Sequence, residues 1–284
     1  MKTIKNVLSV SKALFFRMFR EPKNYIAILW VVLFWFQTYA GIRGFSQYTG
    51  VNVTCWGLPL MADLPVVQAV IAFGAVFIFC DAPFLDRNSY YMVIRTGRRK
   101  WAGGQILYIW GTGLLYAVLL FILMNTMFFP RLSLSDEWGA VFNTLAQTNM
   151  GASFGLAQFE YTIILRFDPI VATCLVLLAI WLNTVIIGLT QLVLNGYFPR
   201  GIGIAAGGVI MFSPYLAQKL SVGYIGYYFS FPSWINLSIY DWDGITQLPS
   251  PLYIAAFWVM AIILLTVLAC RRTVKGDLDV ISQV

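Results

Sequence analysis

Long apolar runs alternate with short polar segments along this chain, and this alternation predicts its main helices. A membrane-spanning helix needs roughly 20 mostly apolar residues, and the polar segments between the runs are too short for a separate soluble domain. We therefore predict an all-α integral membrane protein with six transmembrane helices in a single domain, residues 1–284. The six runs lie at residues 25–39, 58–79, 103–129, 169–195, 201–220 and 252–270.

Residues 2–20 show a different pattern, typical of a helix that lies on a membrane. Apolar side chains such as Ile4, Leu8 and Leu14 share one face at helical spacing, and Lys5 and Lys12 lie elsewhere. We predict an amino-terminal amphipathic helix on the inner membrane surface. The alternative is a signal peptide cleaved before Gly41, but the stretch ahead of the first apolar run is too long and too amphipathic.

In two regions the pattern does not decide which residues form a spanning helix. Pro59, Asp63 and Pro65 crowd the start of the second run, so a helix that starts near Asp63 and an irregular outer segment are both compatible with it. Residues 130–168 are moderately apolar and are the only candidate for a seventh span. A seventh span would move the basic carboxyl-terminal tail outside, against the positive-inside bias. We expect 130–168 to be an external loop and both termini to be cytoplasmic.

The segment between the second and third runs is polar and strongly cationic. It contains Arg87, Arg95, Arg98, Arg99 and Lys100. Short cationic loops stay on the cytoplasmic side during insertion, so we predict that residues 82–102 form a cytoplasmic loop. The other external loop, residues 221–250, is rich in tyrosine, tryptophan and phenylalanine, which settle at the headgroup level of a membrane. Short interfacial helices fit this loop.

Composition and charge exclude several classes of function. The chain is 60% hydrophobic and 11% charged, and its net charge of +7 comes from basic residues beside the apolar runs. These residues act as topology signals and contact anionic lipid, so a nucleic-acid partner is not expected. There is no histidine, and the four scattered cysteines form no CxxC pair, so we expect no metal site.

Catalytic motifs are also missing from the sequence. No GxxxxGK[ST] loop is present to hold nucleotide phosphates, and no HExxH or GxSxG motif occurs. We expect no catalytic residues and no cofactor in this chain, and any ATP and Mg²⁺ would bind to another polypeptide. The spans instead carry amides, which either bond to neighbouring helices or line a mildly polar path. The candidate lining residues are Gln37, Gln68, Asn125, Asn183 and Gln191.

The cationic loop and its surroundings resemble one family of membrane proteins. An acidic residue, a short helix-compatible piece and the sequence RTGRRKWAGGQILYI lead into the third span, and FPSW precedes the last span. This layout, with the amphipathic helix and six spans, resembles that of ABC-2 type transporter permeases over nearly the whole chain. The loop departs from the commoner pattern of that family at Asp86 and at 94–97.

The resemblance implies a mechanism for the cationic loop. In ABC-2 permeases this loop holds a coupling helix that docks on ATPase subunits, and the expected docking segment here is 84–94, with Tyr90 and Tyr91 as anchors. The implied coupling residues are Phe84, Asp86, Arg87, Tyr90, Tyr91 and Arg95. A solvated basic linker is the alternative interpretation of the loop, and lipid anchoring alone explains 98–100.

The function implied is that of a permease subunit in an ATP-driven exporter of the cell membrane, with a bacterial plasma membrane expected. Its partners would be ABC ATPase subunits, membrane lipid and a second permease chain, identical or related. The expected cargo is amphipathic, such as an antimicrobial peptide, a drug or a lipid. The alternatives are a non-transporting sensor or scaffold that recruits a cytoplasmic partner, and an ion-coupled secondary transporter.

Overall fold

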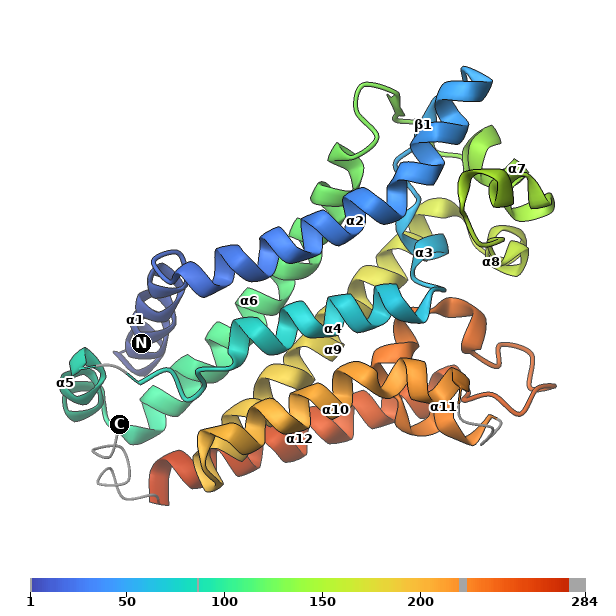
Figure 1. Ribbon diagram of the computed structural model, residues 1–284. Coiled ribbons are helices and arrows are strands. Elements are labelled where there is room, and N and C mark those ends of the chain that lie inside the picture. Colours follow the sequence, from blue (N-terminus) through green and yellow to red (C-terminus); the bar gives the residue numbers. More distant parts are fainter. Residues whose placement is uncertain (1, 86, 220–223, 276–284) are drawn as a thin grey trace.

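The computed structural model describes residues 2–85, 87–219 and 224–275, and most of these residues are helical. Within them, five helices are long and apolar enough to cross a membrane, which supports an all-α multi-pass membrane protein. They run side by side along one direction (Figure 1). The five are α2 (Pro22–Thr49), α6 (Arg98–Thr126), α9 (Pro169–Tyr197), α10 (Arg200–Lys219) and α12 (Pro251–Lys275).

The second predicted span is divided into two helices. α3 (Leu58–Met61) is a single helical turn, and α4 (Pro65–Phe79) follows it. α4 begins with Pro65, and the missing N–H of a proline costs no helical hydrogen bond in the first turn. α4 has 15 residues, so it is about 22 Å long and shorter than the roughly 30 Å hydrocarbon core of a bilayer. It nevertheless lies inside the bundle, against α2, α9 and α10.

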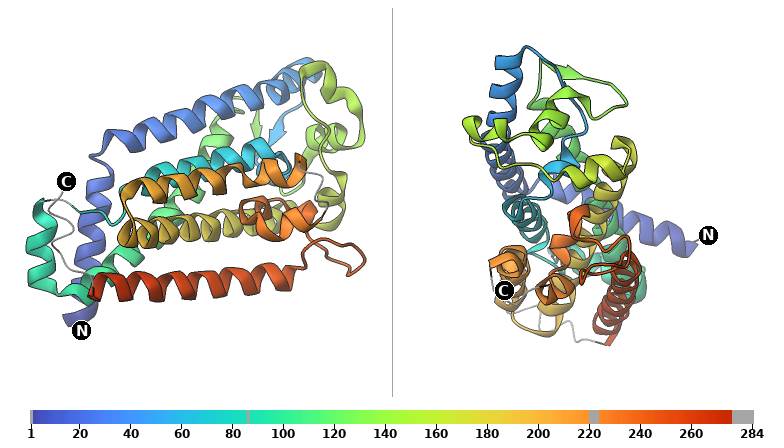
Figure 2. Two further views of the ribbon diagram at one scale, coloured as in Figure 1. Left: turned by 60° about the horizontal axis from the view of Figure 1, so that its bottom comes forward. Right: turned by 90° about the vertical axis from the view of Figure 1, so that its right-hand side faces the viewer.

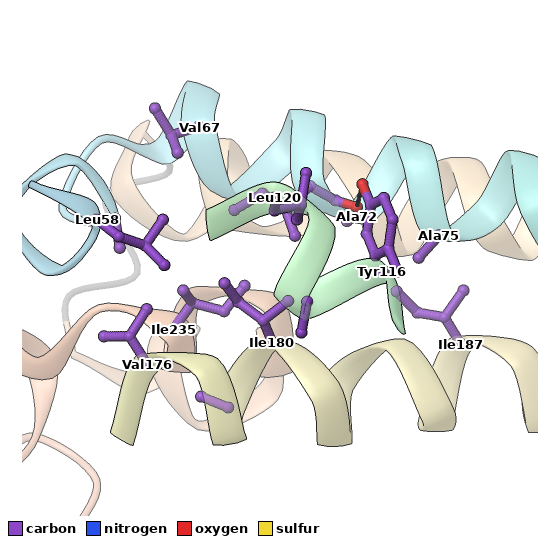
Figure 3. Packing of buried hydrophobic residues seen from close by; sticks show 14 of the residues in the cluster. Leu58, Val67, Ala72, Ala75, Tyr116, Leu120, Val176, Ile180, Ile187 and Ile235 are labelled. Carbon is purple, nitrogen blue, oxygen red and sulfur yellow. Dashed lines mark hydrogen bonds between the residues drawn. The ribbon is translucent and has the colours of Figure 1, made fainter. Parts of the chain in front are cut away.

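α9 is the central helix of the bundle, in contact with α4, α6, α10 and α12. The Tyr116 hydroxyl of α6 donates to the Ile71 carbonyl of α4 at 3.0 Å, and it fits because a Cβ on Gly74 would overlap it. Apolar side chains of α4, α6 and α9 fill the space between these helices (Figure 3). They include Val67, Ala72, Ala75, Leu120, Val176, Ile180 and Ile187.

α2 lies at the edge of the bundle and is longer than the run 25–39 predicted. It continues to Thr49 and stops at Gly50, whose φ of 70° is a left-handed conformation that suits glycine. Gly41 and Gly44 lie inside this extension, beside η1 (Asn149–Phe154): a Cβ on Gly41 would overlap Leu156 and the Phe154 carbonyl, and a Cβ on Gly44 would lie tightly against the Phe154 ring. Glycine has a low intrinsic helix propensity. The helix nevertheless continues through these positions, because close packing against residues 154–156 requires small residues there.

One end of the bundle carries α1 (Lys2–Met18), α5 (Arg87–Thr96), the starts of α6 and α10 and the end of α12. We call it the basic end. α1 and α5 run across the direction of the long helices (Figure 2). α1 is the predicted amphipathic helix, but Val10, Leu14 and Met18 pack inward, whereas Ile4 and Leu8 remain exposed. A Cβ on Gly104 of α6 would overlap Val10, so this glycine lets α1 approach closely.

The opposite end is built from short elements. β1 (Val53–Thr54) pairs in parallel with β2 (Leu132–Ser133), with Val53 opposite Leu132. Helices α7 (Gly139–Gln147) and α8 (Tyr161–Arg166) follow, so no described helix within 130–168 is long enough to be a seventh span. The short helices expected within 221–250 are present: α11 (Ile225–Phe229), η2 (Phe231–Ile235) and η3 (Leu237–Ile239).

Candidate functional site

The candidate site is the turn that joins α4 to α5 at the basic end, with α5 itself. We call residues 80–85 the elbow. α5 ends at Thr96, and Gly97 then turns the chain into α6 with a φ of 86°, which favours glycine over residues that carry a Cβ. α5 therefore lies between two turns, outside the bundle and across its end (Figures 1 and 2).

Side-chain amides of two spanning helices hold the carbonyl groups of the elbow. Asn195 of α9 donates from Nδ2 to the carbonyls of Ala82 at 3.0 Å and Cys80 at 3.3 Å. Gln105 of α6 donates to the Pro83 carbonyl. One turn before Asn195, Gln191 donates to the Val76 carbonyl of α4 at 3.0 Å. The end of α4 and the elbow are therefore joined to α6 and α9 by hydrogen bonds to backbone atoms.

Phe84 fixes the last part of the elbow from inside the fold. It is 5% exposed and packs edge-on against Tyr108, with ring centroids 4.9 Å apart. Its φ of 55° is left-handed, a conformation that costs free energy for a residue with a Cβ. Arg17 of α1 donates to its carbonyl oxygen at 2.9 Å. Phe84 thus positions α5 and offers no surface to a partner in this structure.

An ionic cluster joins the elbow to the link between α1 and α2. Glu21 pairs with Arg17 at 2.6 Å and with Lys23 at 3.3 Å, and Lys23 also pairs with Asp81 of the elbow. Partial burial acts to raise the pKa of Asp81, but the hydrogen bond and charge of Lys23, helped by Arg17, bring it below its ordinary value. Asp81 is therefore held as a carboxylate at neutral pH.

α5 presents an exposed surface on the side away from the bundle. Tyr91 and Ile94 are 77% and 79% exposed, and Arg95 is exposed beside them, whereas Val93 is buried. We call Tyr91, Ile94 and Arg95 the docking face. Asp86 lies outside the described residues, and the structure describes only the backbone of Arg87 and Tyr90. Of the six coupling residues predicted from the sequence, Tyr91 and Arg95 are therefore the ones seen at the surface.

Further contacts join the start of α6 to the end of α12, and the end of α12 to the end of α9. Arg98 donates to the Val274 carbonyl of α12 at 3.2 Å. Arg272 of α12 donates to the Gly196 carbonyl at the end of α9, and its guanidinium lies 5.4 Å from the centre of the Tyr197 ring. These arginines therefore join spanning helices in addition to adding positive charge at the membrane surface.

The amides predicted to line a path do not converge on one. Gln68 bonds to the Ala62 carbonyl at 2.8 Å, and Asn183 bonds both to the Phe231 carbonyl at 3.0 Å and to Trp258 at 2.9 Å. Gln191 joins α4 as described above. Gln37 is exposed on the outside of α2, and Asn125 is half-buried near the opposite end. Three of the five amides therefore serve as ties between elements of this chain.

Sequence reasoning missed two groups of functional interest. Asn195 and Gln105 hold the elbow, and the four-residue spacing of Gln191 and Asn195 was the available signal, because it places both amides on one face of α9. Asp63 lies between α3 and α4, where it accepts hydrogen bonds from Asn236 at 2.6 Å and Ser238 at 3.2 Å. The sequence feature that could have indicated this role of Asp63 is a carboxylate inside an apolar stretch.

Comparisons with known proteins assign no family to this chain. Searches of protein-family models, of curated proteins and of solved structures found no match. Among the described residues, no group of three or more cysteine, aspartate or glutamate side chains is placed to hold a metal ion.

Proposed function

We propose that this chain is the permease subunit of an ATP-driven exporter of ABC-2 type in the cell membrane, here a bacterial plasma membrane. α4 serves as the sixth span together with the five long helices, and the basic end with both termini faces the cytoplasm. This orientation places the clustered arginines and lysines inside, in agreement with the positive-inside bias.

One observation carries the proposal: α5 exposes an apolar and cationic face while the chain on either side of it is tied to the spans. Tyr91 and Ile94 form that face, and the elbow before α5 bonds to α1, α6 and α9. A surface helix held in this way passes a push from a partner to the spanning helices as a rigid-body shift. A solvated basic linker would not require the hydrogen bonds that join the elbow to α1, α6 and α9.

The partner supplies the energy. The sequence contains no phosphate-binding loop, so ATP and Mg²⁺ bind to separate ABC ATPase subunits, and this chain holds no cofactor. α2 lies at the edge of the bundle with a broad exposed apolar side that includes Trp30, Leu33 and Phe36, beside Gln37. That side suits lipid or a second permease chain, identical or related. A path shared by two chains with such walls suits an amphipathic cargo, such as an antimicrobial peptide, a drug or a lipid.

The docking face can be tested by the double substitution Tyr91→Ala and Ile94→Ala. Truncation of a hot-spot residue in an interface costs about 2 kcal/mol or more, and tyrosine is enriched among hot spots, so we expect roughly tenfold or greater weakening of ATPase binding. The measurement is affinity purification from native membranes, identification of the ATPase that is retained, and ATP hydrolysis by the reconstituted pair. The thermal midpoint of the purified chain is expected to stay unchanged, because both side chains are exposed.

A matched control uses the same residue types at the opposite end. Tyr224 and Ile225 are 52% and 61% exposed, so Tyr224→Ala with Ile225→Ala removes similar surface far from α5. This control should bind the ATPase as the unaltered chain does. Equal binding by the docking-face variant would contradict the proposal. A retained partner that hydrolyses no ATP would favour a scaffold, and transport that follows an ion gradient without ATP would favour a secondary transporter.

A further inference from the structure

α1 lies across the basic end of the bundle, and only part of its apolar face is covered (Figure 2). Val10, Leu14 and Met18 form the covered row, on the side that packs against the bundle. A second apolar row runs beside it, and we call it the open row. It consists of Ile4, Leu8, Phe15 and Phe19. At about 100° per residue these four positions fall within about 60° around the helix axis. Three of them are 47–67% exposed, and Phe15 is partly buried.

Lysine side chains border the open row on the side away from the bundle. Lys5 and Lys12 occupy the next positions around the helix, and both are exposed. Neither forms an ion pair with any residue that the structure describes, and Lys12 Nζ lies 5.8 Å from the centre of the Phe16 ring. α1 contains no acidic residue. The order around the helix is therefore bundle contact, open row and positive charge.

The open row adjoins the exposed apolar side of the first spanning helix. The Tyr25 hydroxyl of α2 donates to the Phe19 carbonyl at 2.6 Å. Tyr25, Ile26 and Trp30 are 55%, 60% and 57% exposed. Because α2 crosses the membrane and α1 runs across its direction, α1 lies where the spans reach the membrane surface. An amphipathic helix in this position buries its apolar row between headgroups and acyl chains and keeps its lysines among the headgroups.

The arrangement favours an anionic lipid surface as the occupant of this face. A soluble protein on the open row would have to enter the membrane boundary beside Tyr25 and Ile26. An uncharged bilayer would satisfy the apolar row and leave the lysines without a counter-charge. A lysine near an anionic leaflet contributes about fivefold to membrane affinity. Lys5 and Lys12 therefore make a negatively charged leaflet the better match.

The side of α1 away from the open row is bonded to the elbow. Arg17 donates to the Phe84 carbonyl at 2.9 Å and pairs with Glu21 at 2.6 Å. The Met18 carbonyl accepts a hydrogen bond from the buried Asn24 of α2 at 2.8 Å. The end of α1 is thus fixed between the elbow and α2. Any force that holds α1 at the membrane surface also holds the bond from Arg17 to the elbow.

We propose that α1 binds anionic phospholipid in the leaflet at the basic end, and that this binding stabilises the elbow. The open row lies at the boundary between headgroups and acyl chains, and Lys5 and Lys12 contact negatively charged headgroups. Anionic lipid is then a regulator of the elbow and, through it, of the position of α5. The proposal concerns α1 and the elbow, and it does not depend on the function proposed above.

The test compares the full-length protein in nanodiscs of phosphatidylcholine with the same protein in mixed nanodiscs of phosphatidylcholine and phosphatidylglycerol. Hydrogen exchange is measured at residues 4–18 and 80–85. Two lysines near an anionic surface correspond to at most roughly a thirtyfold change. We expect exchange in α1 to slow severalfold in the mixed nanodiscs, within that limit, and exchange at 80–85 to slow less. Added salt should reduce the difference, because it screens the charges.

Three variants separate charge from apolar insertion. Lys5→Gln with Lys12→Gln should make exchange in α1 nearly equal in the two lipids. Lys219→Gln removes an exposed lysine at the opposite end and should keep the full difference. Leu8→Gln weakens insertion of the open row, so exchange in α1 should rise in both lipids and most of their ratio should remain.

Three results would overturn the proposal. The first is equal exchange of α1 in the two lipids for the unaltered chain, which would mean that the open row binds lipid without regard to charge or does not bind it. The second is an undiminished difference in the double lysine variant. The third is slower exchange in α1 with no change at 80–85, because it would show that lipid binding does not reach the elbow.

Discussion

The two ends of α4 are held in different ways. At the basic end, side chains of α1, α2, α6 and α9 bond to the elbow, most of them to backbone carbonyls. At the other end, the Asp63 carboxylate accepts bonds from Asn236 and Ser238, which belong to the short-helix segment after α10. One end of α4 is therefore joined to the spanning helices, and the other mainly to elements that do not span.

This difference assigns separate roles to the two ends. Bonds to several spanning helices transmit displacement, because any movement of the elbow moves its partners on α6 and α9. The Asp63 junction bonds to one short segment, so it reaches the spanning helices less directly. If α5 is pushed by a partner, α4 carries that displacement to Asp63, and the segment 225–240 passes it on to α9, α10 and α12, on which it packs.

The largest effect is expected at the basic end, from Asn195→Leu. The substitution keeps the side-chain volume but removes the donor that the Cys80 and Ala82 carbonyls share. Leaving buried carbonyls unpaired costs about 1–3 kcal/mol, so the thermal midpoint in a fixed detergent should fall by several degrees. Hydrogen exchange should accelerate at 80–85 and in the described part of α5, and less at 236–240.

Asn125→Leu is the matched control, because its amide donates only within its own helix. We expect Asn125→Leu to change the free energy of unfolding by no more than about 0.5 kcal/mol, the effect of an ordinary surface substitution. If the two variants lose the same stability, or if exchange in Asn195→Leu rises equally at both ends of α4, the elbow is not a distinct point of attachment.

A smaller effect is expected from pH, with opposite signs at the two ends. Burial raises the pKa of Asp63, the Asn236 hydrogen bond lowers it in part, and Glu160 raises it further, so the pKa lies above its ordinary value. Its ionised form therefore destabilises this junction at neutral pH, and that cost is relieved as the pH falls through the raised value. The pKa of Asp81 is lowered, so its stabilising contribution is lost only at pH values below the ordinary range.

Hydrogen exchange measured between pH 7 and pH 3, corrected for the intrinsic rate, separates the two carboxylates. Protection of 60–66 and 236–240 should rise first as the pH falls, and protection of 80–85 should then drop at lower pH. Asp63→Asn should remove the first change and keep the second. Loss of protection at both junctions in the same pH range would show that these carboxylates do not distinguish the two ends.

The pattern of the sequence predicted the long helices well, because long apolar periodicity reports burial in lipid or protein directly. The sequence pattern was less informative about helix ends and side-chain partners that depend on tertiary packing. The extension of α2 past Gly41 depends on contacts with residues 154–156, which lie more than a hundred residues away. The amides of the spans were recognised, but whether Gln191 lines a path or bonds to the Val76 carbonyl depends on the orientation of α4. Side-chain partners distant in sequence cannot be inferred from one chain.

The smallest effects concern two ion pairs, one at each end of the molecule. Lys23 and Asp81 are 20% and 47% exposed, and other side chains of the elbow surround them. Asp81→Asn should cost at most about 1 kcal/mol, because solvent still reaches the carboxylate. Arg166 and Asp243 are 38% and 56% exposed at the opposite end, so Asp243→Asn should leave the thermal midpoint unchanged.

Raising the salt concentration sharpens this last comparison. Screening weakens an exposed pair more than a partly buried one, so 0.5 M NaCl should leave most of the difference between Asp81→Asn and the unaltered chain in place. A larger loss from Asp243→Asn than from Asp81→Asn would reverse the assignment, and it would make the pairing of α8 with the segment after η3 the firmer attachment of the two.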